Sequence, residues 1–368
     1  MSFGLAVEET CLVFAYLPKD ADLKEDLKLV AKTKIKMLEP KLFPDIEPDL
    51  VERLVPHLRY LIGRRLEEVA TQKEFQEVKD CLSASSTSPF LSIAYKSVKD
   101  GTLKQILPVE LLAIALDTFR KELTSEYALN FKFCVTSVPP YFNDSQRQQM
   151  KDLITLCGMT CLRIINDATA ASLRFALNKR TETNVVNGFH LGKHGCHFSD
   201  LMIEDGIFEI RICDVLTKGT AAAKKKLTKL IAGYVLQVSK GGTCADESMI
   251  ESHVNERFTT GAWKEATFPV TGGTGGSVSI KPSKLEELEL ANEALFSLED
   301  LSELFKKNKS YFKQDEVTRV IVFGNTEFAE STVELIRKVY ENVEILMDEN
   351  PLITAAIGCS DQAKILRP

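Results

Sequence analysis

Short apolar runs alternate with amphipathic stretches along the first half of the chain, and this alternation predicts strands and helices in turn. Residues 3–7 and 11–16 are apolar on either side of Glu8-Glu9-Thr10, which is typical of two strands joined by a turn. Residues 131–138 predict a buried strand. Residues 150–157 place apolar side chains three and four positions apart, as in a helix with one buried face.

The second half of the chain repeats this arrangement. Residues 185–195 predict a strand and a turn, and Asp205-Gly206 separates the two strands of a hairpin. A long helix over 221–238 and a strand-helix-strand-helix series over 317–366 complete this half. Two α/β halves that each open with a strand-turn-strand unit indicate a bilobal fold with a central cleft.

Charged residues dominate positions 20–80, where the spacing predicts helices interrupted by prolines. The whole chain has a formal net charge of −6, so it lacks the basic surface expected of a nucleic-acid-binding protein. The N-terminal apolar runs are too short to span a bilayer, and glutamates stand where a signal peptide needs positive charge. We therefore expect a cytoplasmic protein, also compatible with the nucleus, that binds neither nucleic acid nor membrane.

Several long motifs occur in the order found in one protein family. They are VPPYFNDSQRQ, LRIINDATAAS, IEDGIFE, YLIGRR and ENPLITAAIGCSDQAKIL. With them the chain resembles the ATPase domain of the heat shock protein 70 chaperones, weakly over 17–55 and 215–315. The resemblance implies an α/β, actin-like (ribonuclease H-like) two-lobed ATPase fold with a central cleft.

The resemblance also implies a division into domains. We expect an N-terminal lobe over 1–180 with a peripheral subdomain over 19–106, and a C-terminal lobe over 181–368 with a peripheral subdomain over 226–315. The boundary falls best within 178–183. The resemblance covers no peptide-binding domain, so we expect none in this chain.

The family's nucleotide site can be compared residue by residue. Residues at matching positions that would contact ATP or ADP with magnesium are Thr10, Arg59, Asp167, Gly192, Gly324, Asn325 and Thr326. The first phosphate loop departs from the family pattern, because Ala6 takes the place of an aspartate and Glu8 and Glu9 replace a glycine and a threonine. A carboxylate there blocks backbone approach to phosphate and repels it.

The second phosphate loop departs as well. The family has aspartate-leucine-three-glycines-threonine, and this chain has His190-Leu191-Gly192-Lys193-His194-Gly195. For the helix that normally packs on adenine, Arg257 is the single candidate. Because phosphoryl transfer depends on positioned charges and a magnesium ion, we expect no catalytic residue, no significant ATP hydrolysis, and weak or no binding of ATP or ADP.

Residues that match the family's partner-facing positions are better preserved. The resemblance implies that they contact J-domain co-chaperones or the neighbouring domain, and that nucleotide-exchange factors or other chaperones are further candidate partners. These residues are Arg147, Arg163, Asn166, Thr169, Glu204 and Asp205. Alternatively, the segment persists because it builds a core strand and helix, and for the two arginines both interpretations remain open.

Two other patterns suggest sites. His190, His194, Cys196 and His197 are residue types that bind zinc or copper, but they lack a complete spacing motif, so we expect no metal site. The glycine-rich segment 272–277 precedes a predicted strand rather than a helix, so it predicts a hairpin tip and not a phosphate loop.

Three hypotheses about function follow. The first is a non-hydrolysing chaperone-family protein that regulates chaperones through protein contacts. The second is an ATP-binding component of the protein-folding machinery that retains nucleotide binding. The third is a structural role, or a decaying gene copy.

Overall fold

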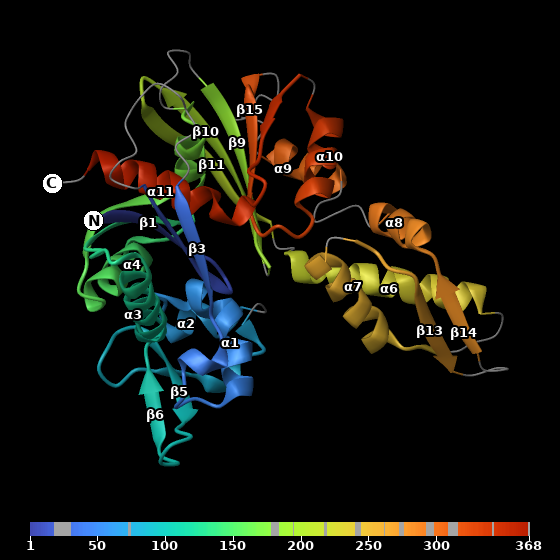
Figure 1. The fold of residues 1–368 in the computed structure, drawn as a ribbon, viewed down its shortest axis with the longest axis horizontal. Coiled ribbons are helices and arrows are strands. Elements are labelled where there is room, and N and C mark those ends of the chain that lie inside the picture. The colour runs from blue at the N-terminus through green and yellow to red at the C-terminus, as the bar shows by residue number, and fades with distance from the viewer. Residues whose placement is uncertain are drawn as a thin grey trace.

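The computed structural model of the chain describes most of its length. The described residues are 1–17, 31–72, 75–177, 184–193, 195–216, 219–239, 244–260, 262–271, 276–291, 298–307, 316–340 and 342–366. Over these ranges the chain folds into two five-stranded and two three-stranded sheets with helices packed around them, which confirms the α/β class (Figure 1). The predicted lobe boundary and the tip of the glycine-rich hairpin (272–275) lie outside the described residues.

The N-terminal sheet has the strand order β3-β2-β1-β7-β8. Its strands are β1 (Ser2–Val7), β2 (Cys11–Tyr16), β3 (Lys32–Met37), β7 (Phe133–Val138) and β8 (Thr160–Asn166). The strands β1, β2 and β3 are antiparallel neighbours, whereas β7 and β8 run parallel to β1. We define the N-terminal lobe by this sheet and the elements packed on it.

The C-terminal sheet has the order β11-β10-β9-β15-β16 and repeats that topology. Its strands are β9 (Asn184–Leu191), β10 (Cys196–Glu204), β11 (Ile207–Leu216), β15 (Arg319–Gly324) and β16 (Glu344–Leu346). The hairpin β10–β11 turns through Asp205 and Gly206, both at positive φ (48° and 77°), as a two-residue turn that matches strand twist requires. We define the C-terminal lobe by this sheet, and the matching topology confirms the two similar halves.

The remaining elements of the N-terminal half are peripheral helices and one small sheet. They are η1 (Pro40–Leu42), α1 (Pro48–Leu61), α2 (Leu66–Val69), η3 (Lys79–Cys81), β4 (Leu82–Ala84), β5 (Leu91–Lys96), β6 (Leu103–Ile106), α3 (Pro108–Tyr127), α4 (Asp144–Leu156) and α5 (Asp167–Arg174). Helix α4 begins with a capping box, in which the Asn143 side chain accepts the Gln146 N–H.

The helical prediction for residues 20–80 is wrong at 32–37. Here Lys32–Met37 forms an edge strand whose three lysines alternate with Thr33, Ile35 and Met37. The period of two lets this strand pair with the apolar β2 along its whole length. Lysine on an edge strand also opposes pairing with a second sheet, which explains why such a polar segment can be a strand.

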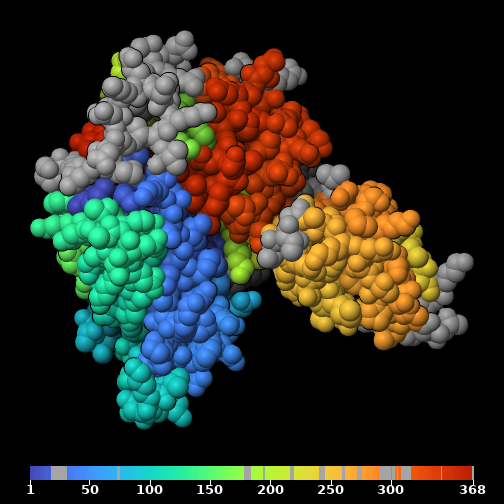
Figure 2. Space-filling view, viewed as in Figure 1, coloured from blue at the N-terminus to red at the C-terminus, as the bar shows by residue number. Residues whose placement is uncertain are grey.

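The remaining elements of the C-terminal half include a peripheral subdomain. They are α6 (Thr220–Val238), β12 (Cys244–Ala245), α7 (Glu247–Thr260), β13 (Ala266–Thr271), β14 (Gly276–Ile280), α8 (Pro282–Ala291), α9 (Leu298–Lys307), α10 (Ala329–Val339), η6 (Pro351–Ile353) and α11 (Thr354–Ile365). Helices α6, α7 and α8 pack on β13 and β14 around Ile231, Trp263 and Phe268. Figure 2 shows this part as a separate mass beside the lobes.

Helices α5 and α11 join the two lobes. Helix α11 lies against β1 and α5, and Figure 1 shows it running between the two large sheets. Two glycines permit this contact, because a Cβ on Gly358 would lie 1.8 Å from the Ala170 carbonyl oxygen and one on Gly4 would lie 2.2 Å from that of Ala356. The close packing fixes where the strand ends of the two sheets face each other.

No helix among the described residues is both long and apolar enough to cross a membrane.

Candidate functional site

A cleft of about 220 Å³ lies between the turns that connect the strands of the two lobes. The N-terminal lobe contributes the β1–β2 turn, and the C-terminal lobe contributes the segments after β9 and β15. Its polar lining residues include Glu8, Glu9, Thr10, Lys193, Asn325 and Thr326. Ligand pockets for small molecules usually measure about 300–1,000 Å³, so this cleft is small for one.

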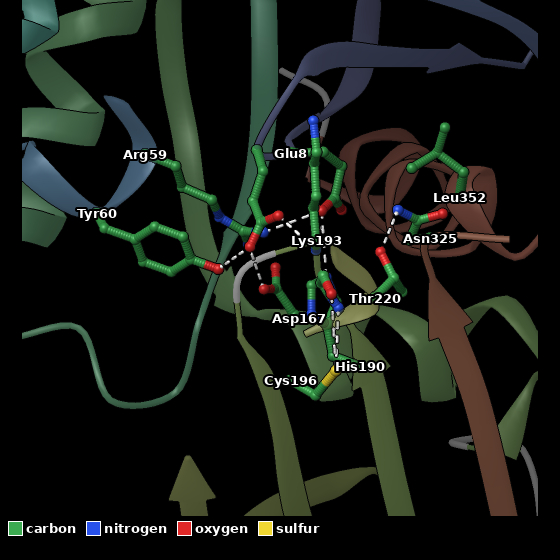
Figure 3. A network of polar contacts seen from close by, with 12 residues as sticks. Glu8, Arg59, Tyr60, Asp167, His190, Lys193, Cys196, Thr220, Asn325 and Leu352 are labelled. Carbon is green, nitrogen blue, oxygen red and sulfur yellow. Dashed lines mark hydrogen bonds and ion pairs between the residues drawn. The ribbon is translucent and has the colours of Figure 1, made fainter. Parts of the chain in front are cut away.

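A buried ion network lies beside the cleft (Figure 3). The Arg59 guanidinium on α1 donates to Glu8 Oε2 at 3.0 Å and to Asp167 Oδ2, at the start of α5, at 2.5 Å. Glu8 Oε2 also lies 3.1 Å from His190 Nε2 at the end of β9. The four side chains are between 0% and 6% exposed, so water screens these charges little. The network joins both lobes through one carboxylate.

The network favours the ionised forms of Glu8 and Arg59. Burial by itself raises the pKa of Glu8, but Arg59 and His190 outweigh it and lower that pKa to about 2. Burial likewise opposes the charge of Arg59, and Asp167 and Glu8 more than compensate, so the pKa of Arg59 is raised above its usual value. Glu8 therefore carries a negative charge at neutral pH.

Glu9 makes a second connection across the cleft. One oxygen of Glu9 accepts a hydrogen bond from the Tyr60 hydroxyl at 2.5 Å, and the other accepts the backbone N–H of Lys193 in the turn after β9. Burial and the Glu9 carboxylate raise the pKa of Tyr60 well above its usual value, so the phenol stays a donor. Two consecutive glutamates thus bind the helix behind them and the lobe opposite.

His190 and His197 stack on each other beside the cleft. His190 and His197 occupy paired positions on β9 and β10, with ring centroids 4.4 Å apart and planes at 13°. Tyr141 meets His197 edge-on at 5.7 Å. Burial, His190 and Arg59 keep the pKa of His197 well below its usual value. Within the described ranges no three His, Cys, Asp or Glu side chains could share a metal ion, and His194 lies outside them.

Backbone contacts shape the C-terminal wall of the cleft. Gly192 packs so closely that a Cβ there would lie 2.0 Å from the Gly195 carbonyl oxygen. Gly324 has φ 99° at the end of β15, and the following Asn325 donates its N–H to the Leu191 carbonyl at 2.7 Å. The Asn325 side chain approaches the Thr220 hydroxyl at 3.4 Å. These contacts hold the two C-terminal segments together.

The structure gathers the predicted nucleotide-site residues, but in two groups. Thr10, Gly192, Asn325 and Thr326 line the cleft, and Gly324 directly precedes this lining. Arg59 and Asp167 instead pair with each other in the buried network. The adenine-side candidate Arg257 is engaged elsewhere, because its Nε donates to Glu289 at 3.2 Å.

The predicted partner-facing residues lie on β8, α4, α5 and the β10–β11 turn. Arg147 donates to Asn166 at 2.7 Å and to the carbonyls of Phe142 and Pro140, so these two predicted residues meet. Arg163 is exposed on the edge strand β8, and Thr169 is half-buried on α5. Glu204 and Asp205 are exposed at the tight turn. Arg163, Glu204 and Asp205 are therefore the exposed charged residues of this set.

The sequence did not reveal which residues pair in the buried network beside the cleft. Glu8, Glu9 and His190 stood out as departures from a pattern, and His197 stood out only as a possible metal ligand, while Tyr60, Tyr141 and the backbone of Lys193 gave no signal of a shared role. One clue was present: both acidic replacements fall in one loop, and Arg59 and His190 fall at positions that the fold brings toward it. A search for basic residues complementary to the acidic turn could therefore have indicated the network.

Removing the buried cation should destabilise the fold strongly. Replacing Arg59 by methionine leaves Glu8 and Asp167 buried without their main partner, so we expect a loss of about 3–5 kcal/mol in the free energy of unfolding. The matched control on the same helix is Arg53→Met, which breaks the exposed pair with Asp80 and should cost about 1 kcal/mol or less. Urea unfolding would measure both, and equal small losses would contradict a buried network.

Ionised Glu8 should also make stability depend on acid pH. Because the pKa of Glu8 falls from 4.5 unfolded to about 2 folded, its contribution is fully present above pH 4.5 and is lost as the pH falls toward 2. Between pH 6 and pH 3 the native protein should lose about 2 kcal/mol more than Glu8→Gln. Parallel urea titrations at these pH values test this, and identical losses in the two proteins would refute it.

Comparison with known proteins agrees with this architecture. Residues 50–224 match the family model described as Hsp70 protein. A similar curated protein is heat shock 70 kDa protein 2 of Paracoccidioides lutzii (strain ATCC MYA-826 / Pb01), with 35% identity over 153 residues. The aligned stretch covers 41% of this chain and 23% of that relative, so the match spans less than a quarter of the relative's length.

The matched residues run from α1 into α6 and contain Arg59, Asp167, the end of β9 and the C-terminal hairpin β10–β11. They therefore include parts of both lobes and β9, whereas the other two strands that end at the cleft, β1 and β15, lie outside the match. The paired sheets, the cleft between them and the match over residues 50–224 together support a nucleotide-binding domain of the heat shock protein 70 family, with its actin-like fold.

Proposed function

We propose that this protein is a non-hydrolysing member of the heat shock protein 70 family that regulates chaperones through protein contacts. The observation that carries the proposal is the bridge from Arg59 through Glu8 to His190. In it, side chains of the protein occupy the wall of the cleft at which a phosphate loop is expected. Such a domain would offer its surface to partners without a cycle of nucleotide binding and hydrolysis.

The residues of the cleft do not fit a magnesium-bound triphosphate. Catalysis of phosphoryl transfer relies on carboxylates that order magnesium and on donors that face the phosphates. Here Ala6 and His190 stand at the two aspartate positions, and the Lys193 N–H is already bound by Glu9. Glu8 and Glu9 would repel the phosphates at short range in a poorly screened site. We therefore derive no catalytic step through magnesium or ATP.

A second candidate function is nucleotide binding without efficient hydrolysis. The observation in its favour is that a cleft of about 220 Å³ persists and that Thr10, Gly192, Asn325 and Thr326 line it. Under this alternative the protein would be an ATP-binding component of the folding machinery. A purely structural role, or a decaying gene copy, requires neither nucleotide nor partner.

A thermal shift assay with nucleotide separates the first two functions. A ligand that binds only the folded state at a hundredfold excess over its dissociation constant adds about 2.7 kcal/mol of stability. We expect millimolar Mg-ATP and Mg-ADP to leave the melting temperature of this protein unchanged, with an ordinary family ATPase domain as the positive control. A saturable upward shift, or measurable turnover, would support the nucleotide-binding alternative instead.

We propose that J-domain co-chaperones contact the surface around β8 and the Arg147–Asn166 pair. The support is that Arg163 is exposed on an edge strand, where a charged side chain has no packing role to fulfil. Exposed charges at an interface mainly speed association and select partners. The same surface could serve other chaperones or exchange factors of complementary acidic character.

A pulldown with an isolated J-domain tests this contact. We expect Arg163→Ala to reduce recovery severalfold at low salt and to leave the melting temperature unchanged, because the side chain is exposed. Lys99→Ala, which removes another exposed cation, 64 positions earlier in the sequence, is the control and should retain full recovery. Equal recovery with both variants, or no recovery with the native protein, would contradict a J-domain contact at Arg163.

A further inference from the structure

The side chains of Glu8 and Glu9 each contact one group in the N-terminal lobe and one group in the C-terminal lobe. On its own side, Glu8 accepts from Arg59 and Glu9 accepts from Tyr60, two consecutive residues of α1. On the opposite side, Glu8 contacts His190 and Glu9 accepts the Lys193 N–H. The two carboxylates therefore form a double bridge between the β1–β2 turn and the segment that ends β9.

The bridge uses donors that would otherwise face the cleft. Lys193 is a cleft-lining residue and donates its backbone N–H to Glu9 rather than toward the open volume. Both glutamates are buried, at 5% and 4% exposure, although they sit in a turn, where glutamate side chains normally extend into water. A buried carboxylate needs such donors, and here the donors come from both lobes.

We propose that Glu8 and Glu9 act as a built-in anionic ligand that holds the two lobes closed in the absence of any bound molecule. This inference rests on the proposed function and adds the conformational state of the cleft. Because the carboxylates belong to the chain, their effective concentration at the opposite loop is high and does not depend on ligand supply. A free anion would have to displace them from the same donors.

Two neighbouring features favour a closed state of this kind. The His190 ring is stacked on His197 and packs edge-on against Phe323, so the side chain that meets Glu8 is held in place by the C-terminal sheet. On the other side, Arg59 is fixed by Asp167. Because the partners are rigid, the bridge loses little conformational entropy when it forms.

Opening of the bridge can be followed at the Lys193 amide in protein labelled with ¹⁵N-lysine. In the native protein this N–H should exchange slowly with solvent. Glu9→Gly removes its acceptor, so exchange should become about tenfold faster or more, as expected for loss of one charge-assisted hydrogen bond. Glu9→Gln, a milder variant that keeps a neutral acceptor, should fall between the two, and it preserves the test if the glycine variant folds poorly.

Inorganic phosphate is the probe that separates a bridging role from a merely structural one. In Glu9→Gly it should occupy the vacated donors, slow Lys193 exchange again and raise the melting temperature in a saturable way. The control is Glu52→Gly, an exposed substitution on α1 that destabilises the protein through lower helix propensity and should show no specific phosphate response. Potassium chloride at equal ionic strength corrects for screening.

The outcomes distinguish this inference from the proposed function. Fast Lys193 exchange in the native protein, or a Glu9→Gly variant with native exchange, would overturn the bridge. A phosphate response no larger than that of Glu52→Gly would overturn the role as an anion substitute. Binding of Mg-ATP by the native protein would instead overturn the proposed function. If the native protein does not bind Mg-ATP and the bridge test also fails, only this inference is overturned.

Discussion

The Arg59 guanidinium is the charge on which the organisation of the cleft depends. It lies buried between Glu8 and Asp167, and through them it connects α1 with the β1–β2 turn and with the start of α5. A buried cation is costly unless carboxylates compensate it, and a buried carboxylate is costly without a cation. Each member of the network therefore requires the others. Apolar side chains of similar volume in place of all of them could give equal stability. The network thus fixes a particular geometry more than it adds net stability.

That geometry matters because of where the two sheets meet. Close packing of α11 against β1 and α5, permitted by Gly4 and Gly358, brings the turns after β1 and β9 face to face. In such a fold the space between the turns is available for a ligand. Here the protein's own carboxylates line it and reach across it. The proposed role as a chaperone regulator follows from this arrangement, since a cleft bridged from within has no need of a nucleotide to define its state.

The candidate site was predictable in part. Alignment with the family motifs located Thr10, Gly192, Asn325 and Thr326, which line one cleft in the structure. The same comparison marked Glu8, Glu9 and His190 as replacements, but treated them as separate losses. Glu8 contacts Arg59 and His190, which lie 51 and 182 positions away in the sequence, and the contact with His190 forms only after both lobes have folded. A list of substitutions contains no information on such distances.

The sequence by itself determined most of the order of the elements, the repeated strand-turn-strand units and the α/β class, because hydrophobic periodicity and capping signals act over a few residues. Its long motifs carried the resemblance to the family. It could not determine that the polar stretch Lys32–Met37 is a strand, since that depends on pairing with β2. Nor could it decide what the glutamates of the first turn do. An acidic turn is ordinarily solvated, and only the approach of α1 and β9 in the folded protein, which excludes water and supplies donors, makes these carboxylates a bridge.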